Sequence, residues 1–443
     1  MSWLERARLS EASSSELKTN SERLGRAAAQ LRTAVRSVIS PDDIVAAQKV
    51  SLEGARNEIR SACRSVFEGE SWDEFTPEEK DALVEDLLDI VFGFGPLENM
   101  LADDTITEVM VNGASSVFFE RKGKLYPGTQ VFSDDEQVRA LIDRILGPLG
   151  RRIDEASPMV NARLPQGHRV HAIIPPLAID GPCLTIRKFS KNVLKLESMV
   201  ESNSIDANVR QLLEWAVLVR KNIAVSGGTG SGKTTLLNAL SCVIPAGERI
   251  ITIEDSAELR FLEHPHVVRL EARPRNAEGF GEVTIRDLVI NALRMRPDRI
   301  VVGECRGAEA LDMLQAMNTG HDGSLTTLHA NSPAEVVSRL TTMVRYTADL
   351  PADVIEAYIA SALDLVIQTA RAVDGSRYVS DIVSFSYDAE RRACVITPLY
   401  KRGPLEVRGT WFEEPAWLET VVAFGYAARE EVEAWRHRLS LAA

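Results

Sequence analysis

The stretch Gly227-Gly-Thr-Gly-Ser-Gly-Lys-Thr234 decides the fold of this 443-residue chain. It fits the pattern G-x-x-x-x-G-K-[ST], in which glycines let backbone N–H groups converge on phosphate oxygens. The apolar run Ile223–Ser226 before it predicts a strand, and Thr235–Leu240 after it predicts a helix. Because strand, loop and helix occur in the order that this pattern requires, the sequence predicts a P-loop NTPase of α/β fold rather than a flexible glycine loop with an incidental lysine.

The loop supplies a set of predicted nucleotide contacts. Lys233 is expected to reach the β- and γ-phosphates of ATP, and Thr234 to hold Mg²⁺. The N-terminus of the following helix adds a positive partial charge. The predicted nucleotide-binding residues are Gly227, Gly228, Thr229, Gly230, Ser231, Gly232, Lys233, Thr234 and Thr235.

Acidic residues end two further predicted strands. Arg249–Asp255 ends in Glu254 and Asp255, and Arg299–Glu304 ends in Glu304, with Gly303 where many such motors carry an aspartate. A P-loop NTPase needs an acid at the end of a neighbouring strand, to hold the metal or to orient the attacking water. We expect Glu254 or Glu304 to be the water-orienting base, and Thr234 and Glu304 to be the Mg²⁺ ligands; the alternative for each acid is an ordinary solvated strand end.

Two histidines flank a third short strand, which runs from Ser324 to Leu328. His321 and His329 are predicted to sense the γ-phosphate by hydrogen bonding, with His329 also a catalytic candidate. A satisfied polar side chain is the alternative for either. A metal site is disfavoured, because no further ligand cluster accompanies them.

Charge and composition exclude some classes of function. The chain has 51 Lys and Arg against 64 Asp and Glu, a formal net charge of -13. Such a balance does not favour a long-range attraction to nucleic acid or anionic lipid. No stretch of about 18 consecutive apolar residues occurs, so membrane association is expected only through partners. The five cysteines have neither zinc-site nor disulfide spacing, and the N-terminus lacks the apolar core of a signal peptide, which together indicate a reducing cytoplasm.

The patterning divides the chain into five parts. Residues 1–72 predict a helical region, and residues 73–190 a small α/β domain. Residues 191–208 lack strong periodicity and predict a linker or hinge. Strands and helices alternate over residues 209–405, which implies a mostly parallel sheet. Residues 406–443 predict a partly helical C-terminal tail.

The motifs together resemble a known superfamily. After the P-loop come Thr252–Ser256, Arg294–Gly307 and Met317–Asn331, which are similar in order and spacing to the Asp box, Walker B motif and His box of the type II/type IV secretion ATPases. Upstream, Arg163–Pro176 and Asp180–Phe189 resemble the CpaF-type ATPases of tight-adherence (Flp) pilus assembly. The sequence has nothing like the four-cysteine zinc module of several type II secretion ATPases, which favours the tight-adherence branch or the type IV secretion traffic ATPases.

The resemblance implies a fold, an assembly and a location. It implies a RecA-like P-loop motor domain preceded by a PAS-like domain, assembled as a homo-hexamer. The ring would lie in the cytoplasm, peripheral to the inner-membrane face, and would drive an inner-membrane platform protein of a pilus or secretion machine. The family also implies that arginines of the N-terminal domain approach the phosphates. Arg169 and Arg187 are the candidates here, with Arg163 a weaker one, and Arg306 is expected to pair with a nearby acid.

Three other functions compete with pilus assembly. A traffic ATPase for type IV secretion or conjugation is a sister function within the superfamily. A RecA-like nucleic-acid translocase is disfavoured by the acidic balance and by the lack of an aromatic-basic stripe, so no nucleic-acid partner is expected. A small-molecule kinase is disfavoured because no lid segment is evident.

Overall fold

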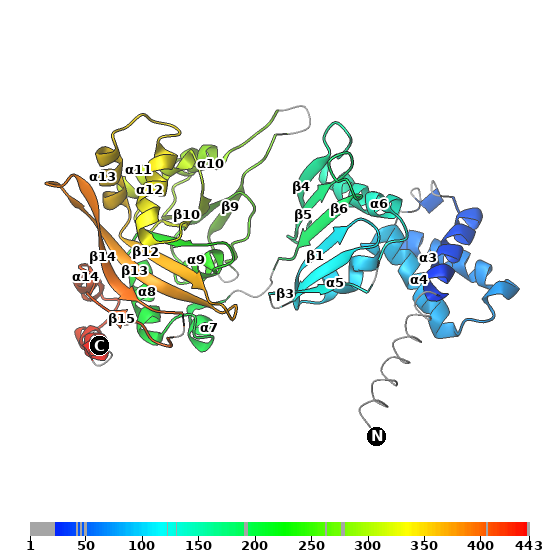
Figure 1. Ribbon diagram of the computed structural model, residues 1–443, viewed down its shortest axis with the longest axis horizontal. Coiled ribbons are helices and arrows are strands. Elements are labelled where there is room, and N and C mark those ends of the chain that lie inside the picture. Colours follow the sequence, from blue (N-terminus) through cyan, green and yellow to red (C-terminus); the bar gives the residue numbers. More distant parts are fainter. Residues whose placement is uncertain are drawn as a thin grey trace, which may run out of the picture. The chain divides into compact units, whose positions relative to one another are not determined.

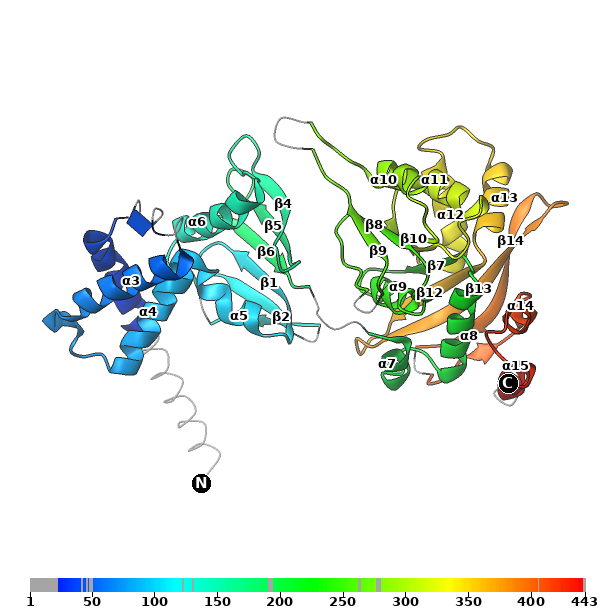
Figure 2. The same cartoon turned by 180° about the vertical axis from the view of Figure 1, so that it is seen from behind.

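The structure is a computed structural model that describes residues 23–440, apart from residues 41–42, 45–46, 48–50, 122, 130, 190–193, 262–263, 276–279 and 405. The chain forms two compact units, residues 1–190 and residues 191–443. Figures 1 and 2 show the elements of each unit from opposite sides.

Helices open the first unit. Residues 23–38 form a helix, followed by α3 (Leu52–Phe67) and α4 (Pro77–Phe92). Leu31, Ile59 and Leu88 are fully buried where these helices pack. Thr76 caps α4 in a capping box with Glu79. The rest of the region expected to be helical, residues 1–22, lies outside the described residues.

A six-stranded antiparallel sheet completes the first unit, with strand order β3-β2-β1-β6-β5-β4. Helix α6 covers one face, because Val138, Leu141 and Ile142 lie on one side of the helix and pack against the apolar residues of the strands. The elements are α5 (Glu98–Ala102), β1 (Ile106–Asn112), β2 (Val117–Arg121), β3 (Lys124–Pro127), α6 (Asp135–Leu146), β4 (Met159–Arg163), β5 (Arg169–Ile173) and β6 (Cys183–Arg187), with short 3-10 turns at Glu70–Trp72, Gly95–Leu97 and Gly147–Leu149.

The second unit is built on a nine-stranded sheet of order β15-β14-β13-β12-β7-β11-β10-β8-β9. The strands from β12 to β9 in this order are parallel, and β13, β14 and β15 are antiparallel. The strands are β7 (Ile223–Gly227), β8 (Ile250–Glu254), β9 (Val267–Glu271), β10 (Arg299–Cys305), β11 (Leu325–His329), β12 (Leu365–Arg371), β13 (Arg377–Asp388), β14 (Ala393–Lys401) and β15 (Thr410–Trp411).

Helices cover both faces of this sheet (Figures 1 and 2). Strands β7 and β8 are buried at every residue, which is why they read as continuous apolar runs rather than alternating ones. The helices on one face are α7 (Leu196–Glu201), α8 (Ala207–Leu218), α9 (Lys233–Ser241), α14 (Leu418–Ala423) and α15 (Arg429–Ser440). Those on the other face are α10 (Ile285–Ala292), α11 (Glu309–Asn318), α12 (Pro333–Val344) and α13 (Ala352–Ala362). The mixed α/β fold predicted from the sequence is confirmed.

Two segments differ from the expected division. Residues 191–208 were expected to be a linker, but they contain α7, whose Leu196 and Met199 are buried in the core of the second unit. A six-residue helix is too short for its periodicity to stand out in the sequence. The expected C-terminal tail also belongs to this core, because Trp435 is fully buried, with its ring centroid 5.8 Å from that of Trp215.

Candidate functional site

The glycine-rich loop joins the central strand β7 to helix α9. Gly230 and Gly232 have φ angles of +71° and +99°, in the left-handed region that favours glycine. Gly232 is the N-cap residue of α9, and Thr234 and Thr235 lie in the first turn of that helix. The loop therefore presents backbone N–H groups and a helix N-terminus at one point, as phosphate binding requires.

Lys233 lies folded into this loop. Its side-chain amine donates hydrogen bonds to the backbone carbonyls of Gly227 at 3.0 Å and Gly228 at 2.8 Å. The Lys233 Nζ also lies 3.4 Å from the Nε2 of His329. Burial lowers the pKa of the lysine, and the nearby charge of Glu304 partly offsets this effect by raising it. The amine is thus held at the loop beside the acidic edge of the sheet.

Glu304 and His329 meet at that edge. Because β10 and β11 run parallel to β7, their carboxyl ends lie on the same side of the sheet as the loop. The Nε2 of His329 lies 3.6 Å from Oε1 of Glu304, and Arg306 pairs with the other oxygen of Glu304. Burial and the nearby Lys233 lower the pKa of His329, so its neutral form is favoured. The structure thus brings together the predicted residues Lys233, Glu304 and His329, and the expected pairing of Arg306 with an acid is confirmed.

Glu254, at the end of β8, is held differently. Its side chain is 3% exposed, and its Oε1 accepts hydrogen bonds from the backbone N–H groups of Glu258 at 2.8 Å and Leu259 at 2.9 Å. Its buried Oε2 accepts no hydrogen bond from the described part of the chain. Burial raises the pKa of this carboxyl to about 7. A buried carboxylate oxygen without a partner destabilises the fold, which indicates that this oxygen is available to bind a cation or to accept a hydrogen bond from water.

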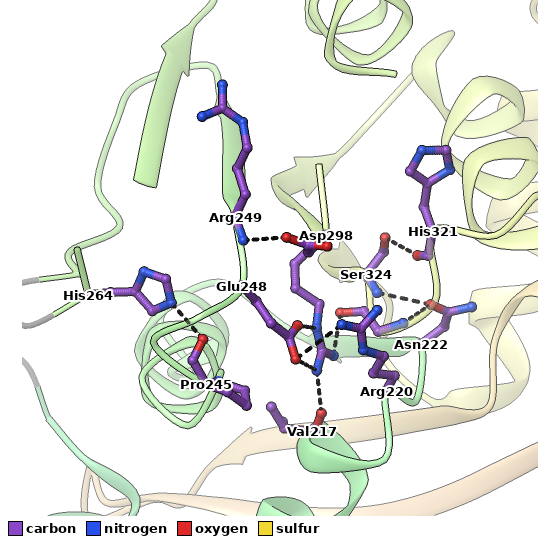
Figure 3. Close-up of polar contacts among 12 residues, drawn as sticks. Val217, Arg220, Asn222, Pro245, Glu248, Arg249, His264, Asp298, His321 and Ser324 are labelled. Carbon is purple, nitrogen blue, oxygen red and sulfur yellow. Dashed lines mark hydrogen bonds and ion pairs between the residues drawn. The ribbon is translucent and has the colours of Figure 1, made fainter. Parts of the chain in front are cut away.

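His321 does not lie at this site, so the expectation that it senses the γ-phosphate there is wrong. Strand β11 pairs Leu325 with Ile223 and His329 with Gly227, which places His329 at the loop. His321 precedes the strand and lies at the opposite, amino edge of the sheet, where its carbonyl accepts a hydrogen bond from Ser324 Oγ (Figure 3). Strand β11 alone separates the two edges by roughly 15 Å, at about 3.3 Å per residue.

The predicted arginines lie together in the first unit. In the strand register, Arg187 on β6 lies opposite Arg169 on β5, and Arg169 lies opposite Arg163 on β4. The three arginines therefore form one cross-strand row. Their neighbours Ile186 and Val170 point to the apolar core under α6, and alternation therefore places the arginines on the other face of the sheet.

Strand β12 contributes residues that the sequence reasoning missed. Thr369 Oγ1 donates a hydrogen bond to the carbonyl of Ser226 at 3.0 Å and lies 2.7 Å from Ser231 Oγ, so it pins the loop on the side away from Glu304. Gln368 contacts Ser226 Oγ and donates to the carbonyl of Ala330 at 3.0 Å. The sequence did contain a signal for these residues: Gln368 and Thr369 directly follow the apolar run Leu365–Ile367. Buried polar groups in a strand need hydrogen-bond partners, so such a pair indicates contacts with neighbouring elements.

This arrangement defines the class of protein. A parallel sheet covered on both faces, a glycine-rich loop with its lysine, and acids at the adjacent strand ends make a P-loop NTPase domain. The model of the family "Type II/IV secretion system protein" matches residues 92–394. The chain belongs to this family.

Relatives and solved structures agree with the family. The putative conjugal transfer protein Rv3659c of Mycobacterium tuberculosis is 40% identical over 311 residues, covering 69% of this chain and 88% of the relative. The type IV secretion system protein VirB11 of Brucella suis is 32% identical over 331 residues, covering 68% of this chain and 92% of VirB11. The crystal structure of the pilus retraction motor PilT with bound ADP is 18% identical with a TM-score of 0.50, covering 66% of this chain and 83% of PilT, and shows likeness of fold alone.

These findings confirm the superfamily that the motifs predicted, and the expected fold of a RecA-like motor preceded by a smaller domain. The two relatives described above are named as a putative conjugal transfer protein and a type IV secretion system protein, and not as proteins of a tight-adherence pilus. None of the helices that the structure describes combines the length and apolarity that a membrane-crossing segment needs.

Proposed function

We propose that this chain hydrolyses ATP and that the energy drives a pilus or secretion machine. The observation that carries the proposal is the meeting of Lys233, Glu304 and His329 at the end of the glycine-rich loop. A cation, a carboxylate and a neutral imidazole at this point can contact, respectively, the β/γ-phosphates, the attacking water and the γ-phosphate.

The two acidic residues have the remaining roles, which are to orient the attacking water and to bind the metal. Glu304 orients the water, because it lies beside both His329 and Lys233. The hydroxyl of Thr234 and the unpartnered oxygen of Glu254 are hard oxygen donors of the kind that Mg²⁺ prefers, and Glu304 is a further donor at the same edge. When bound, Mg²⁺ neutralises charge on the β- and γ-phosphate oxygens. The free Oε2 of Glu254 is the feature of this site that fits such a cation.

We further propose that the chain works as a homo-hexameric ring beside a membrane. The ring acts on an inner-membrane platform protein, and Arg169 and Arg187 approach the phosphates from the first unit. Membrane association comes only through partners, and no nucleic-acid partner is expected. The match to the secretion system family over residues 92–394 and the row of three arginines on β4, β5 and β6 support this assembly.

Two machines are candidates. The upstream motifs Arg163–Pro176 and Asp180–Phe189 favour assembly of a tight-adherence pilus. The 40% identity to a putative conjugal transfer protein favours a traffic ATPase of a type IV system instead. Deletion of the gene, scored for surface pili and for DNA transfer to a recipient cell, separates them: loss of pili alone supports the first, and loss of transfer alone supports the second.

Phosphate release by the purified full chain tests the activity itself. We expect turnover that rises with protein concentration as the ring forms, and that single-stranded DNA does not stimulate. Lys233→Ala should abolish turnover, because it removes the amine that lies at the loop and is expected to neutralise charge on the β- and γ-phosphates. A concentrated protein that binds ATP and releases no phosphate would contradict the proposal.

A further inference from the structure

The hairpin of β12 and β13 runs alongside the glycine-rich loop. Strand β12 pairs with β7 from Leu365 opposite Ile223 to Thr369 opposite Gly227. Strand β7 ends there, whereas β12 continues to Arg371 before the chain turns back into β13. The contact at the start of this overhang is close: a β-carbon at Gly227 would lie 2.4 Å from Thr369 Oγ1. The tip of the hairpin is therefore fixed beside the loop.

Two arginines occupy this tip. Arg371 and Arg377 are direct cross-strand partners. A β-carbon at Gly230 would lie 3.8 Å from Nη1 of Arg371, and one at Gly232 would lie 3.4 Å from Cδ of Arg377. Both side chains thus border the loop glycines, on the flank formed by β12.

The two charges lack a counter-charge within the described chain. Neither Arg371 nor Arg377 has an ion pair or side-chain hydrogen bond to another described residue, and both are exposed. Like charges directly opposite one another on paired strands are destabilising. A bound anion beside the loop would offset that repulsion.

The strand order shows which part of a nucleotide would meet them. Glu304 and His329 lie on β10 and β11, on one side of β7, and β12 lies on the other side. The γ-phosphate end of ATP is directed to the acids, so the opposite end of the molecule leaves the loop toward β12. Resting on the proposed ATPase function, we infer that Arg371 and Arg377 bind the α-phosphate and ribose end of the nucleotide.

This role differs from that of an arginine finger. A finger contacts the γ-phosphoryl group and changes turnover more than binding, and it is indifferent to ADP. Arginines at the nucleoside end contact ATP and ADP alike, so they change the affinity for both and KM more than kcat. They do not discriminate between the states before and after hydrolysis.

Binding of ADP and of inorganic tripolyphosphate to the full chain, measured by calorimetry, tests the inference. For the double variant Arg371→Gln, Arg377→Gln we expect the ADP affinity to fall about tenfold or more, the usual scale for lost charge-assisted hydrogen bonds. Tripolyphosphate keeps a phosphate for these arginines but lacks the ribose, so its affinity should fall by a smaller factor than that of ADP. The KM for ATP should rise by a larger factor than kcat falls, and Arg371→Lys, Arg377→Lys should recover part of the ADP affinity.

The matched control is Arg391→Gln, an exposed arginine at the turn between β13 and β14. It should bind ADP as the natural chain does. Equal ADP affinity of the double variant and the natural chain would overturn the inference, as would an equal loss for ADP and tripolyphosphate, or a loss of kcat with ADP affinity retained. If the natural chain itself binds neither ATP nor ADP, the proposed ATPase function fails, which is a different result from failure of the two arginines.

Discussion

The side chain of Glu254 lies directly over Gly303 of the neighbouring strand. A β-carbon at position 303 would come within 2.8 Å of the Glu254 Cγ, closer than side chains approach one another in folded proteins. The glycine is therefore the residue that lets a carboxylate from β8 occupy the space where β10 would otherwise place its own side chain. This contact accounts for a glycine at the position where many P-loop motors carry an aspartate.

Gly303→Ala should therefore damage the site and the fold together. The added methyl must displace the buried Glu254, and overpacking of this kind destabilises by about 1–3 kcal/mol. Thermal unfolding and phosphate release are the measurements. Gly307→Ala is the control, since a β-carbon there would lie 3.5 Å from the carboxylate of Glu309, an ordinary contact. Equal stability of the two variants would show that Glu254 is not confined by position 303.

Glu254→Gln should alter the pH dependence of stability. Burial raises the pKa of Glu254 from its ordinary 4.5 to about 7, so the folded state binds the proton more tightly than the unfolded state. The free energy of unfolding of the natural chain is therefore highest below about pH 4.5. It falls as the pH rises toward and through 7, by about 3 kcal/mol in total. The amide carries no such penalty.

Unfolding curves of both proteins between pH 5 and 8.5 measure this difference. We expect Glu254→Gln to gain stability relative to the natural chain as the pH rises. Parallel curves over that range would show that the carboxyl at position 254 is not protonated near neutrality.

Glu304→Gln should leave ATP bound but unhydrolysed. The substitution keeps the shape of the side chain and removes the charge that orients the water, for which a loss of about 10²-fold or more is expected. Single-turnover hydrolysis and ATP binding, measured on the same protein, separate the two effects. A larger loss of hydrolysis in Glu254→Gln than in Glu304→Gln would reverse the assignment of the base.

Glu248→Gln should strongly destabilise the second unit. At the amino edge of the sheet, Arg299 is fully buried and donates to Glu248 at 2.5 Å and to the carbonyl of Val217 at 2.8 Å; Figure 3 shows Glu248 among these contacts. Removal of one partner leaves a buried charge uncompensated, which costs about 3–5 kcal/mol. Denaturant unfolding measures it.

The control for this prediction is the exposed pair of Arg275 and Glu282, at 2.9 Å. Glu282→Gln should change the free energy of unfolding by less than about 1 kcal/mol, because solvent screens that pair. Equal effects of the two substitutions would mean that the Arg299 pair is not protected from water.

Arg169→Ala and Arg187→Ala should leave ATP affinity within about tenfold and reduce turnover by about 10³, the lower range for arginine fingers. The reason is that a guanidinium facing the γ-phosphoryl group is needed more in the transition state than in the ground state. A variant of either arginine mixed with Lys233→Ala should recover activity if the arginine acts across a subunit boundary. Full turnover of both single variants would remove these arginines from the site.

Local patterns in the sequence determined the loop, its flanking strand and helix, and the acids at the ends of β8 and β10. Each of these features is a contiguous stretch in which glycine spacing, apolar runs and strand-end charge act together, so neighbouring residues alone specify it. Glu304 and His329 could be placed near the loop for the same reason, because carboxyl ends of parallel strands meet at one edge.

Only the tertiary structure decided the rest. The sequence does not specify which strand lies on each side of β7, so it could not show that Thr369, Arg371 and Arg377 border the loop. It presented His321 and His329 as equivalent ends of a short strand, and the direction of β11 separates them. The sequence around Gly303 does not indicate that Glu254 lies against it, because β8 and β10 are adjacent in the sheet but far apart in the chain. Contacts of this kind are set by the packing of whole elements, and that packing depends on the combined burial of many side chains rather than on any one motif.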